Sequence, residues 1–133
     1  MTRSLLVTPP RKYINSEQVP RVPPLSHAVC WGDLVFVSGQ VGIDHDGQAP
    51  EQFSAEVQNA FTALEHILAA AGSSLHHVVK VNCYLSDIDT RDELNELYMQ
   101  RFPAPRPART TIEAGLAHGL RFEIDAIATR IPR

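Results

Sequence analysis

Arg109 is the first residue whose type and position could do chemistry. It follows the proline-rich stretch RPA at 106–108 and begins a segment whose residues favour a strand. A guanidinium binds a carboxylate through a planar fork of donors, and its burial is costly without a ligand or an acidic partner. A surface position or a structural salt bridge is the more common role for an arginine, so the residues alone leave both roles open.

Glu123 is the second such residue, because it lies inside the otherwise apolar segment FEIDAIA at 122–128. Burial would raise the pKa of this carboxyl toward the range useful for a general base, whereas a nearby arginine would lower it. The alternative is a solvent-facing position, since Glu123, Asp125 and Thr129 share one parity along the segment.

No group of residues has the spacing of a metal site. The six histidines form no HxH or HExxH pattern, and the adjacent His76 and His77 would point apart in a regular element. Cys30 and Cys83 lack CxxC spacing and lie in apolar segments, so we expect buried free thiols. We expect no metal ion.

The whole chain has the composition of an ordinary globular protein. Its 133 residues predict one domain, 1–133, with an extended arm at 1–11. A formal net charge of −3 offers no basic field that would attract nucleic acid or an acidic membrane. The apolar runs are shorter than the roughly 18 residues of a membrane span, and the N-terminal apolar patch is too short for a signal-peptide core. We therefore expect a cytoplasmic protein that binds neither nucleic acid nor membrane.

The spacing of apolar residues predicts the elements that position these side chains. Apolar residues recur every three or four positions at 53–71 and 91–102, which predicts two amphipathic helices. Alternating or continuous apolar residues predict six strands, at 12–14, 28–31, 34–38, 78–85, 109–114 and 120–131. Gly39 is expected to end the third strand, Gly72 to follow the first helix as its C′ residue, and 90–93 (TRDE) to form a capping box for the second helix.

This order of elements predicts an α+β fold, a mixed sheet with two helices on one face. The other face would be left without helices. We expect it to include Val35 or Val37, Val79 or Val81, and alternate residues of the last strand. An uncovered apolar sheet face predicts self-association.

Six stretches together resemble the Rid (reactive intermediate deaminase, YjgF-like) family. They are PLSHAV, GDLVFVSGQ, AAAGSSLHHVVKVNCYLSDI, LNELYMQRFP, PARTTIE and FEIDAIA, in this order along nearly the whole chain. The resemblance implies a chorismate-mutase-like α+β fold and a homotrimer with a barrel-like core and active clefts between subunits. It also implies hydrolysis of small 2-imino acids, such as 2-aminoacrylate, 2-iminopropanoate and 2-iminobutanoate, to 2-keto acids and ammonia, without a metal or organic cofactor.

The resemblance also implies roles for individual residues. Arg109 matches the family's carboxylate-binding arginine, and Glu123 matches the acidic residue that orients the attacking water. Gly39 matches a position whose backbone contacts the substrate, although a glycine that merely ends a strand fits the sequence as well. The other expected substrate-binding residues are Leu25, Asn95, Thr110 and Thr111. A capping or packing role stays open for Asn95.

Several departures from the family pattern leave the substrate open. Deaminases of the family usually carry a tyrosine where Leu25 stands, and often a glutamine where His27 stands. His27 could serve as an acid–base group or as a plain hydrogen-bonding residue. One of Thr110 and Thr111 replaces a cysteine, which argues against a thiol role, and the loop at 115–119 is about one residue shorter. Bulkier or more apolar imines fit these changes.

Two other functions fit the sequence, and a third fits it poorly. A pathway-specific deaminase of an aminomuconate-like metabolite would also need Arg109, as would a non-catalytic trimeric protein that binds or senses 2-keto acids. Some relatives have been described as ribonucleases. The negative net charge and the lack of an aromatic and basic stripe disfavour that activity.

Overall fold

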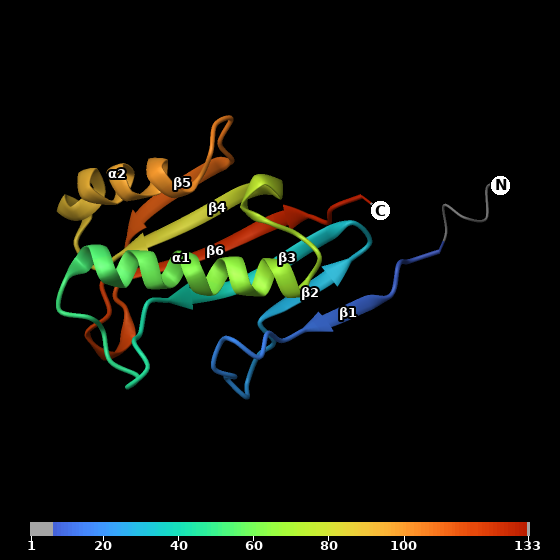
Figure 1. Ribbon diagram of the computed structural model, residues 1–133, viewed down its shortest axis with the longest axis horizontal. Coiled ribbons are helices and arrows are strands. Elements are labelled where there is room, and N and C mark those ends of the chain that lie inside the picture. Colours follow the sequence, from blue (N-terminus) through green and yellow to red (C-terminus); the bar gives the residue numbers. More distant parts are fainter. Residues whose placement is uncertain (1–6, 133) are drawn as a thin grey trace.

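The structure is a computed structural model that describes residues 7–132 (Figure 1). Its helices and strands, in chain order, are β1 (Arg11–Ile14), β2 (Ala28–Trp31), β3 (Leu34–Val41), α1 (Phe53–Ala70), β4 (Val78–Leu85), α2 (Arg91–Arg101), β5 (Ala108–Glu113) and β6 (Phe122–Thr129). Short 3-10 turns precede β4, α2 and β6, at Leu75–His77, Ile88–Thr90 and Ala117–Gly119. Residues 1–6 of the expected arm lie outside the described residues, and Arg11 already belongs to β1.

All six strands form one mixed sheet in the order β1-β2-β3-β6-β4-β5. Neighbouring strands are antiparallel except β4 and β5, which are parallel and therefore need a crossover, and α2 supplies it. The last strand of the chain, β6, lies between β3 and β4 in the middle of the sheet. Both helices cover the same face, as Figure 1 shows. The structure confirms the α+β fold expected from the sequence.

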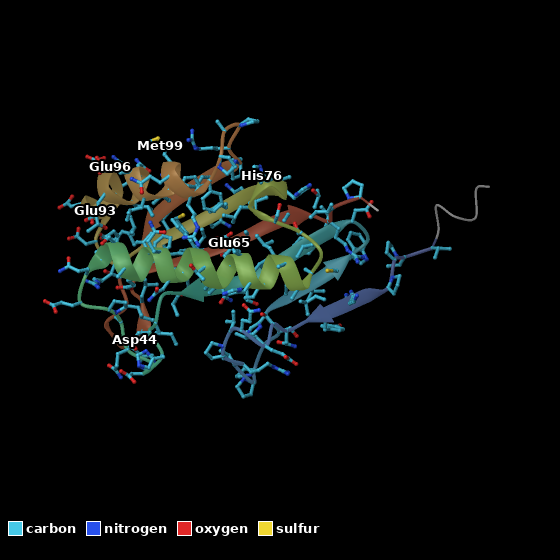
Figure 2. All side chains as sticks on the ribbon, in the orientation of Figure 1. Asp44, Glu65, His76, Glu93, Glu96 and Met99 are labelled. Atoms are coloured by element: carbon cyan, nitrogen blue, oxygen red, sulfur yellow. The ribbon has the colours of Figure 1, made fainter. Side chains whose placement is uncertain are left out.

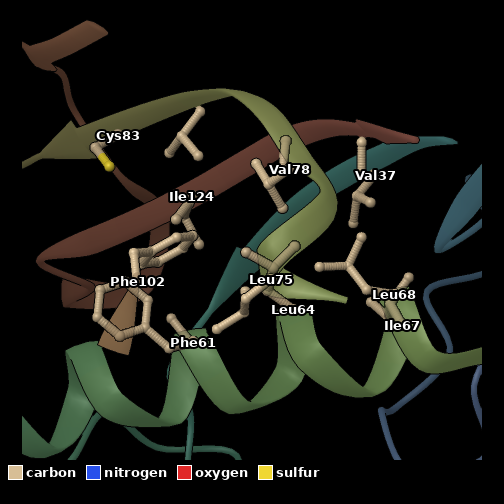
Figure 3. Packing of buried hydrophobic residues seen from close by; sticks show 14 of the residues in the cluster. Val37, Phe61, Leu64, Ile67, Leu68, Leu75, Val78, Cys83, Phe102 and Ile124 are labelled. Carbon is tan, nitrogen blue, oxygen red and sulfur yellow. The ribbon is translucent and has the colours of Figure 1, made fainter. Parts of the chain in front are cut away.

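The core lies between the helices and this covered face. One face of α1 supplies buried residues at spacings of three and four, which are Val57, Ala60, Phe61, Leu64, Ile67 and Leu68. Figure 3 shows several of them packed against the sheet. Phe61 contacts the edges of Phe102 and Phe122, with ring centroids 5.4 and 5.7 Å apart. This aromatic cluster links α1 to the end of α2 and to the start of β6.

The expected membership of the uncovered face was wrong for the valines of β3. Val35 and Val37 are at most 5% exposed and pack in the core, and so does Val81 on β4. Phe36 points to the other side instead and is 40% exposed. Four consecutive apolar residues carry no parity signal, so the register of the β2–β3 hairpin decides which of them faces the helices. Val79 is exposed, at an irregular point of the β4–β6 pairing.

Two local predictions at element ends were also wrong. Gly39 does not end β3, which continues to Val41 through a register shift between Val37 and Gln40. Thr90 makes no side-chain cap to α2, because it closes the preceding 3-10 turn and its hydroxyl donates to the Asp87 carbonyl at 2.7 Å. Gly72 does follow α1 in the left-handed region, with φ of 77°, as predicted.

The face of the sheet without helices is called the open face below. Residues that lie opposite one another in the strand register share this face, and they include Arg11, Tyr13, Val29, Trp31, Phe36, Val41, Lys80, Asn82, Tyr84, Thr110, Ile112, Glu123, Asp125 and Ile127. The part on β1, β2 and β3 is mainly apolar and aromatic, whereas the part on β4 and β6 is mainly polar. The open face therefore differs from the charged outer surface of the helices, where Glu93 and Glu96 project from α2 (Figure 2).

Candidate functional site

Arg109 lies on the edge strand β5, on the side of the sheet that the helices cover. It pairs with Val81 in the parallel β4–β5 register, and Val81 is fully buried on that side. The guanidinium carbon lies 4.7 Å from the centroid of the Tyr98 ring, close enough for a cation–π contact. Nη2 also donates a hydrogen bond to Oδ1 of Asn95. Two residues of α2 thus hold the arginine in place.

The spacing of Asn95 and Tyr98 explains why they act together. Residues three apart share one face of a helix. The face of α2 is anchored by Leu94, which is fully buried, and by Tyr98, whose ring stacks on Phe102 at 4.1 Å. Among the described residues no carboxylate forms an ion pair with Arg109. The guanidinium therefore keeps its charge and its remaining donors available for an anion.

Two buried hydroxyls lie close to Arg109 without hydrogen-bond partners within the described chain. They are Oγ1 of Thr111, two residues along β5, and Oη of Tyr98. Leaving a buried polar group unpaired costs about 1–3 kcal/mol. Both groups could regain a partner from a ligand or a water molecule.

Cys83 lies beside Thr111 in the β4–β5 register and is fully buried. Burial raises the pKa of its thiol to about 12, although the nearby charge of Arg109 acts in the opposite direction. The thiol is therefore protonated near neutral pH and is a poor nucleophile. Both cysteines are free and buried, as the sequence predicted.

Glu123 lies on the open face in the middle of the sheet, opposite Val41 on β3 and Tyr84 on β4. Its carboxyl group lies directly against Gly39. A Cβ atom built at Gly39 would stand 2.9 Å from the carboxyl carbon of Glu123, so only glycine leaves room for this side chain. Burial raises the pKa of Glu123, and the charge of Asp125 raises it further.

Asp125 follows on the same face of β6 and has both carboxylate oxygens occupied. Asn82 Nδ2 donates to Oδ1 at 2.9 Å, and Tyr84 Oη donates to Oδ2 at 2.7 Å. The second bond raises the pKa of Tyr84 to about 12, since ionised tyrosine would lose it. Three side chains from β4 and β6 thus form one polar cluster next to Glu123.

The start of β6 is tied to α1 by a buried carboxylate. Glu56 is fully buried, and its oxygens accept from Arg121 Nε at 2.7 Å and from the backbone N–H groups of Arg121 and Phe122 at 2.6 and 3.2 Å. Arg121 also donates to the carbonyls of Pro50 and Glu51. This clamp positions β6 immediately before Glu123.

Arg109 and Glu123 are not brought together within one chain. Arg109 points toward the helices and Glu123 toward the open face, because their strand positions have opposite parity. Asn95 and Thr111 gather with Arg109, while Gly39 gathers with Glu123. Thr110 lies on the open face, where its hydroxyl accepts from Lys80 Nζ at 2.8 Å.

The two residues that depart from the family pattern lie in the segment before β2. Leu25 is 45% exposed. His27 is buried, and its Nδ1 accepts from the backbone N–H of Ser16 at 2.9 Å. That bond assigns the proton to Nε2, which donates to the Pro20 carbonyl at 2.9 Å. Both ring nitrogens of His27 are therefore used to fold its own segment.

Two residues of the site were not singled out from the sequence. Tyr98 lies within the helix predicted at 91–102, and its position three residues after Asn95 is the usable signal. Asp125 was noted only as a solvent-facing alternative, because its hydrogen bonds come from β4, some 40 residues earlier in the chain.

The fold and the site define a small α+β protein with a helix-held arginine and a glutamate on the open side of a mixed sheet. Residues 16–130 match the family model described as Endoribonuclease L-PSP. The chain belongs to this family, which is also known as the YjgF or Rid family.

Relatives with names and structures support this assignment. A 2-iminobutanoate/2-iminopropanoate deaminase from Bos taurus is 37% identical over 126 residues, which are 92% of each chain. The mitochondrial protein mmf2 from Schizosaccharomyces pombe is 38% identical over 119 residues, 86% of this chain and 94% of the relative. Among solved structures, RidA from an Antarctic Psychrobacter has a TM-score of 0.84 at 33% identity, and the match covers 89% of this chain and 98% of the relative. Yeast Mmf1 has a TM-score of 0.85 at 28% identity, and the match covers 92% of this chain and 100% of the relative.

Neither a metal-binding cluster nor a membrane-spanning helix is present within the described residues, 7–132. No three histidine, cysteine, aspartate or glutamate side chains within 7–132 are grouped as a metal site would require. No helix in the same range has the length and apolar character needed to cross a bilayer. The cytoplasmic location stays a prediction, since one relative is named as mitochondrial.

Proposed function

We propose that the protein hydrolyses small 2-imino acids of the 2-iminopropanoate and 2-iminobutanoate type to 2-keto acids and ammonia. The observation that carries this proposal is Arg109, whose guanidinium is held by Asn95 and Tyr98 without a carboxylate partner among the described residues. Relatives about 37% identical are named as deaminases of these imines, which supports the substrate class.

Arg109 binds the substrate carboxylate in this proposal. A bidentate pair would use guanidinium donors that Asn95 leaves free, and the Tyr98 ring fixes the plane of the fork. The unpaired hydroxyls of Thr111 and Tyr98 would gain partners from the bound ligand or its water. Leu25 would form an apolar wall, and Thr110 and the backbone of Gly39 would contribute polar contacts.

Glu123 acts on the water that attacks the imine carbon. The carboxylate accepts a proton from this water as its oxygen bonds to carbon and the C=N bond becomes a single C–N bond. Protonation of the nitrogen then lets ammonia leave, and the C=O bond of the 2-keto acid forms. The raised pKa of Glu123 suits a carboxylate that must accept a proton and return it. The residues' own groups suffice for each step, so no cofactor is included.

The two halves of the site meet between subunits of a homotrimer in this proposal. Arg109 and Glu123 face opposite sides of their own sheet, so one substrate contacts both only if they come from different chains. The exposed aromatic residues of the open face, including Trp31 and Phe36, support burial against another copy.

The test is hydrolysis of imines generated in situ. The decay of 2-iminobutanoate and 2-iminopropanoate would be followed with wild type, Arg109→Ala, Arg109→Lys and Glu123→Ala, with circular dichroism as a check on folding. We expect wild type to accelerate decay above buffer, and each variant to lower kcat/KM at least about 100-fold, the loss of roughly 2.7 kcal/mol of transition-state binding.

The outcomes separate the competing functions. Folded wild type that leaves imine decay at the buffer rate contradicts the proposal. Tight binding of 2-ketobutyrate without turnover would identify a 2-keto acid sensor. Turnover confined to larger imines would indicate a pathway-specific deaminase. A monomer in light scattering would contradict a site shared between subunits.

A further inference from the structure

The polar cluster of Asn82, Tyr84 and Asp125 has no part in the reaction described above. Asp125 accepts one hydrogen bond on each carboxylate oxygen, at 2.9 Å from Asn82 and 2.7 Å from Tyr84. Both donors come from β4 and are held by its register with β6, in which Asn82 pairs with Asp125. Hydrogen bonds to both oxygens fix the position of the carboxylate.

This fixed charge lies next to Glu123. The two residues are separated by one position on β6, so their side chains leave the same face of the sheet about 7 Å apart. Tyr84 pairs with Glu123 in the register and reaches across to Asp125, so the three side chains adjoin. A like charge at this distance opposes ionisation of Glu123.

Within residues 7–132, the other strands bring no further carboxylate to this part of the open face, and Lys80 is the cation nearest to it. β3 contributes Gly39 and Val41, and β5 contributes Thr110 and Ile112, none of which titrates. On β4 the groups are Tyr84, with the pKa of its phenol raised to about 12, and Lys80. Lys80 pairs with Ile127, two residues further along β6 than Asp125, and its ammonium donates a hydrogen bond to Thr110.

Arg109 does not neutralise the charges of Glu123 and Asp125 within one chain, because its guanidinium lies on the covered side beside Tyr98. Among the described residues Asp125 is therefore the carboxylate that faces Glu123 on this surface. Desolvation and Asp125 act in the same direction, and both raise the pKa of Glu123.

We propose that Asp125, held by Asn82 and Tyr84, is a positioning residue that sets the pH at which Glu123 becomes a working base. The inference rests on the proposed imine hydrolysis. It explains why the carboxylate of Asp125 lies beside a second carboxylate, where like charges repel. Asp125 touches no reacting atom and acts through the proton on Glu123.

The test begins with Asp125→Asn, which removes the charge and keeps the shape. The new amide can still accept from Asn82 through its oxygen and donate to Tyr84 Oη through its nitrogen. We expect the acidic limb of the kcat/KM profile for 2-iminobutanoate to move to lower pH, and the plateau rate to fall. At a pH on the limb, the variant would retain a larger share of its own plateau than wild type does.

Two further variants separate charge from packing. Asp125→Glu keeps the charge and should leave the limb near its wild-type position. Asp46→Asn makes the same chemical change on an exposed loop, where the side chain is 71% exposed, and should leave both limb and plateau unchanged. A limb that moves equally in Asp125→Glu and Asp125→Asn would overturn the proposal, because packing would then account for it.

A second measurement needs no turnover. Carboxyl ¹³C NMR titration without substrate, with Glu123→Gln to assign the signal, would follow Glu123 directly in wild type and Asp125→Asn. A lower midpoint in the variant supports the coupling, and an unchanged midpoint refutes it even if imines are hydrolysed. A lower midpoint in a protein that hydrolyses no imine would overturn both the proposed function and the catalytic meaning of Asp125, while the coupling itself would stand.

Discussion

Gly39 and Glu123 depend on each other at the scale of single residues. The Glu123 carboxyl group occupies the space that a side chain at Gly39 would need. Because Gly39 has no side chain, it leaves room for this carboxyl group, and the backbone around it continues β3 as far as Val41. The same argument does not apply to Gly115, where an added Cβ would meet nothing within 4 Å.

Gly39→Ala should displace the Glu123 carboxyl group and lower imine hydrolysis by about 10-fold or more. A displacement of about 1 Å in a catalytic group can cost as much as 100-fold in rate. Gly115→Ala is the matched control and should keep wild-type kinetics, since its added methyl group enters open space. Steady-state kinetics on both variants checks this, and full activity in Gly39→Ala would show that Glu123 need not lie where the structure has it.

Glu123→Gln should stabilise the protein near neutral pH while it lowers activity. The folded state raises the pKa of this carboxyl, so folding takes up protons. The stability of the wild type therefore falls as pH rises from the pKa of the unfolded state to the higher pKa of the folded state. Glutamine avoids this loss, and we expect its thermal midpoint to be about 1–3 °C higher at pH 7. The difference should shrink at acidic pH, where Glu123 is protonated in both states. Thermal unfolding at several pH values measures it, and a variant less stable at every pH would contradict the sign.

At the scale of elements, two glutamates of α1 bind arginines from other parts of the chain in different surroundings. Glu56 is fully buried and holds Arg121 together with two backbone N–H groups at the start of β6. Glu65 binds Arg101 of α2 with its side chain 43% exposed. Burial and the number of donors, rather than the presence of an ion pair, decide what each contributes.

Glu56→Ala should lower the free energy of unfolding by about 3 kcal/mol, because it leaves the donors of Arg121 and the backbone without an acceptor. Glu65→Ala should cost about 1 kcal/mol or less, since water replaces the exposed pair. Urea unfolding of the two variants gives the comparison. Equal losses would mean that the buried clamp does not determine how firmly β6 is held.

At the scale of the whole molecule, the open face carries large apolar side chains that no described part of the chain covers. Tyr13, Trp31 and Phe36 are 63%, 41% and 40% exposed on it. Large exposed apolar side chains gathered on one side of a sheet favour burial against another protein surface. The proposed trimer would cover them and would also bring Arg109 of one subunit toward Glu123 of another.

Phe36→Asp should dissociate the assembly, because it places a charge on the apolar part of the open face. Multi-angle light scattering would report a mass near that of the 14.7 kDa chain instead of about three times that mass. Met99→Asp is the control, since Met99 is 52% exposed on the outer side of α2 (Figure 2) and should keep the wild-type mass. A trimer that persists in Phe36→Asp with unchanged activity would place the interface elsewhere.

The elements themselves could be predicted from the sequence, because their signals are local. Helical spacing identified α1, and alternation identified β4 with its observed ends. A residue's neighbours within one turn or one strand are enough to decide such features. The resemblance likewise pointed to Arg109 and Glu123 without any knowledge of where they lie.

The sequence by itself determined the elements, their order and the chemical types available for a site. Only the tertiary structure decided which way the residues point. It placed Phe36 on the open face, set Arg109 and Glu123 on opposite sides of the sheet, and joined Asp125 to Tyr84. The physical reason is that a shift of one residue in register reverses every side chain of a strand, and the registers of β6 join segments far apart in the chain.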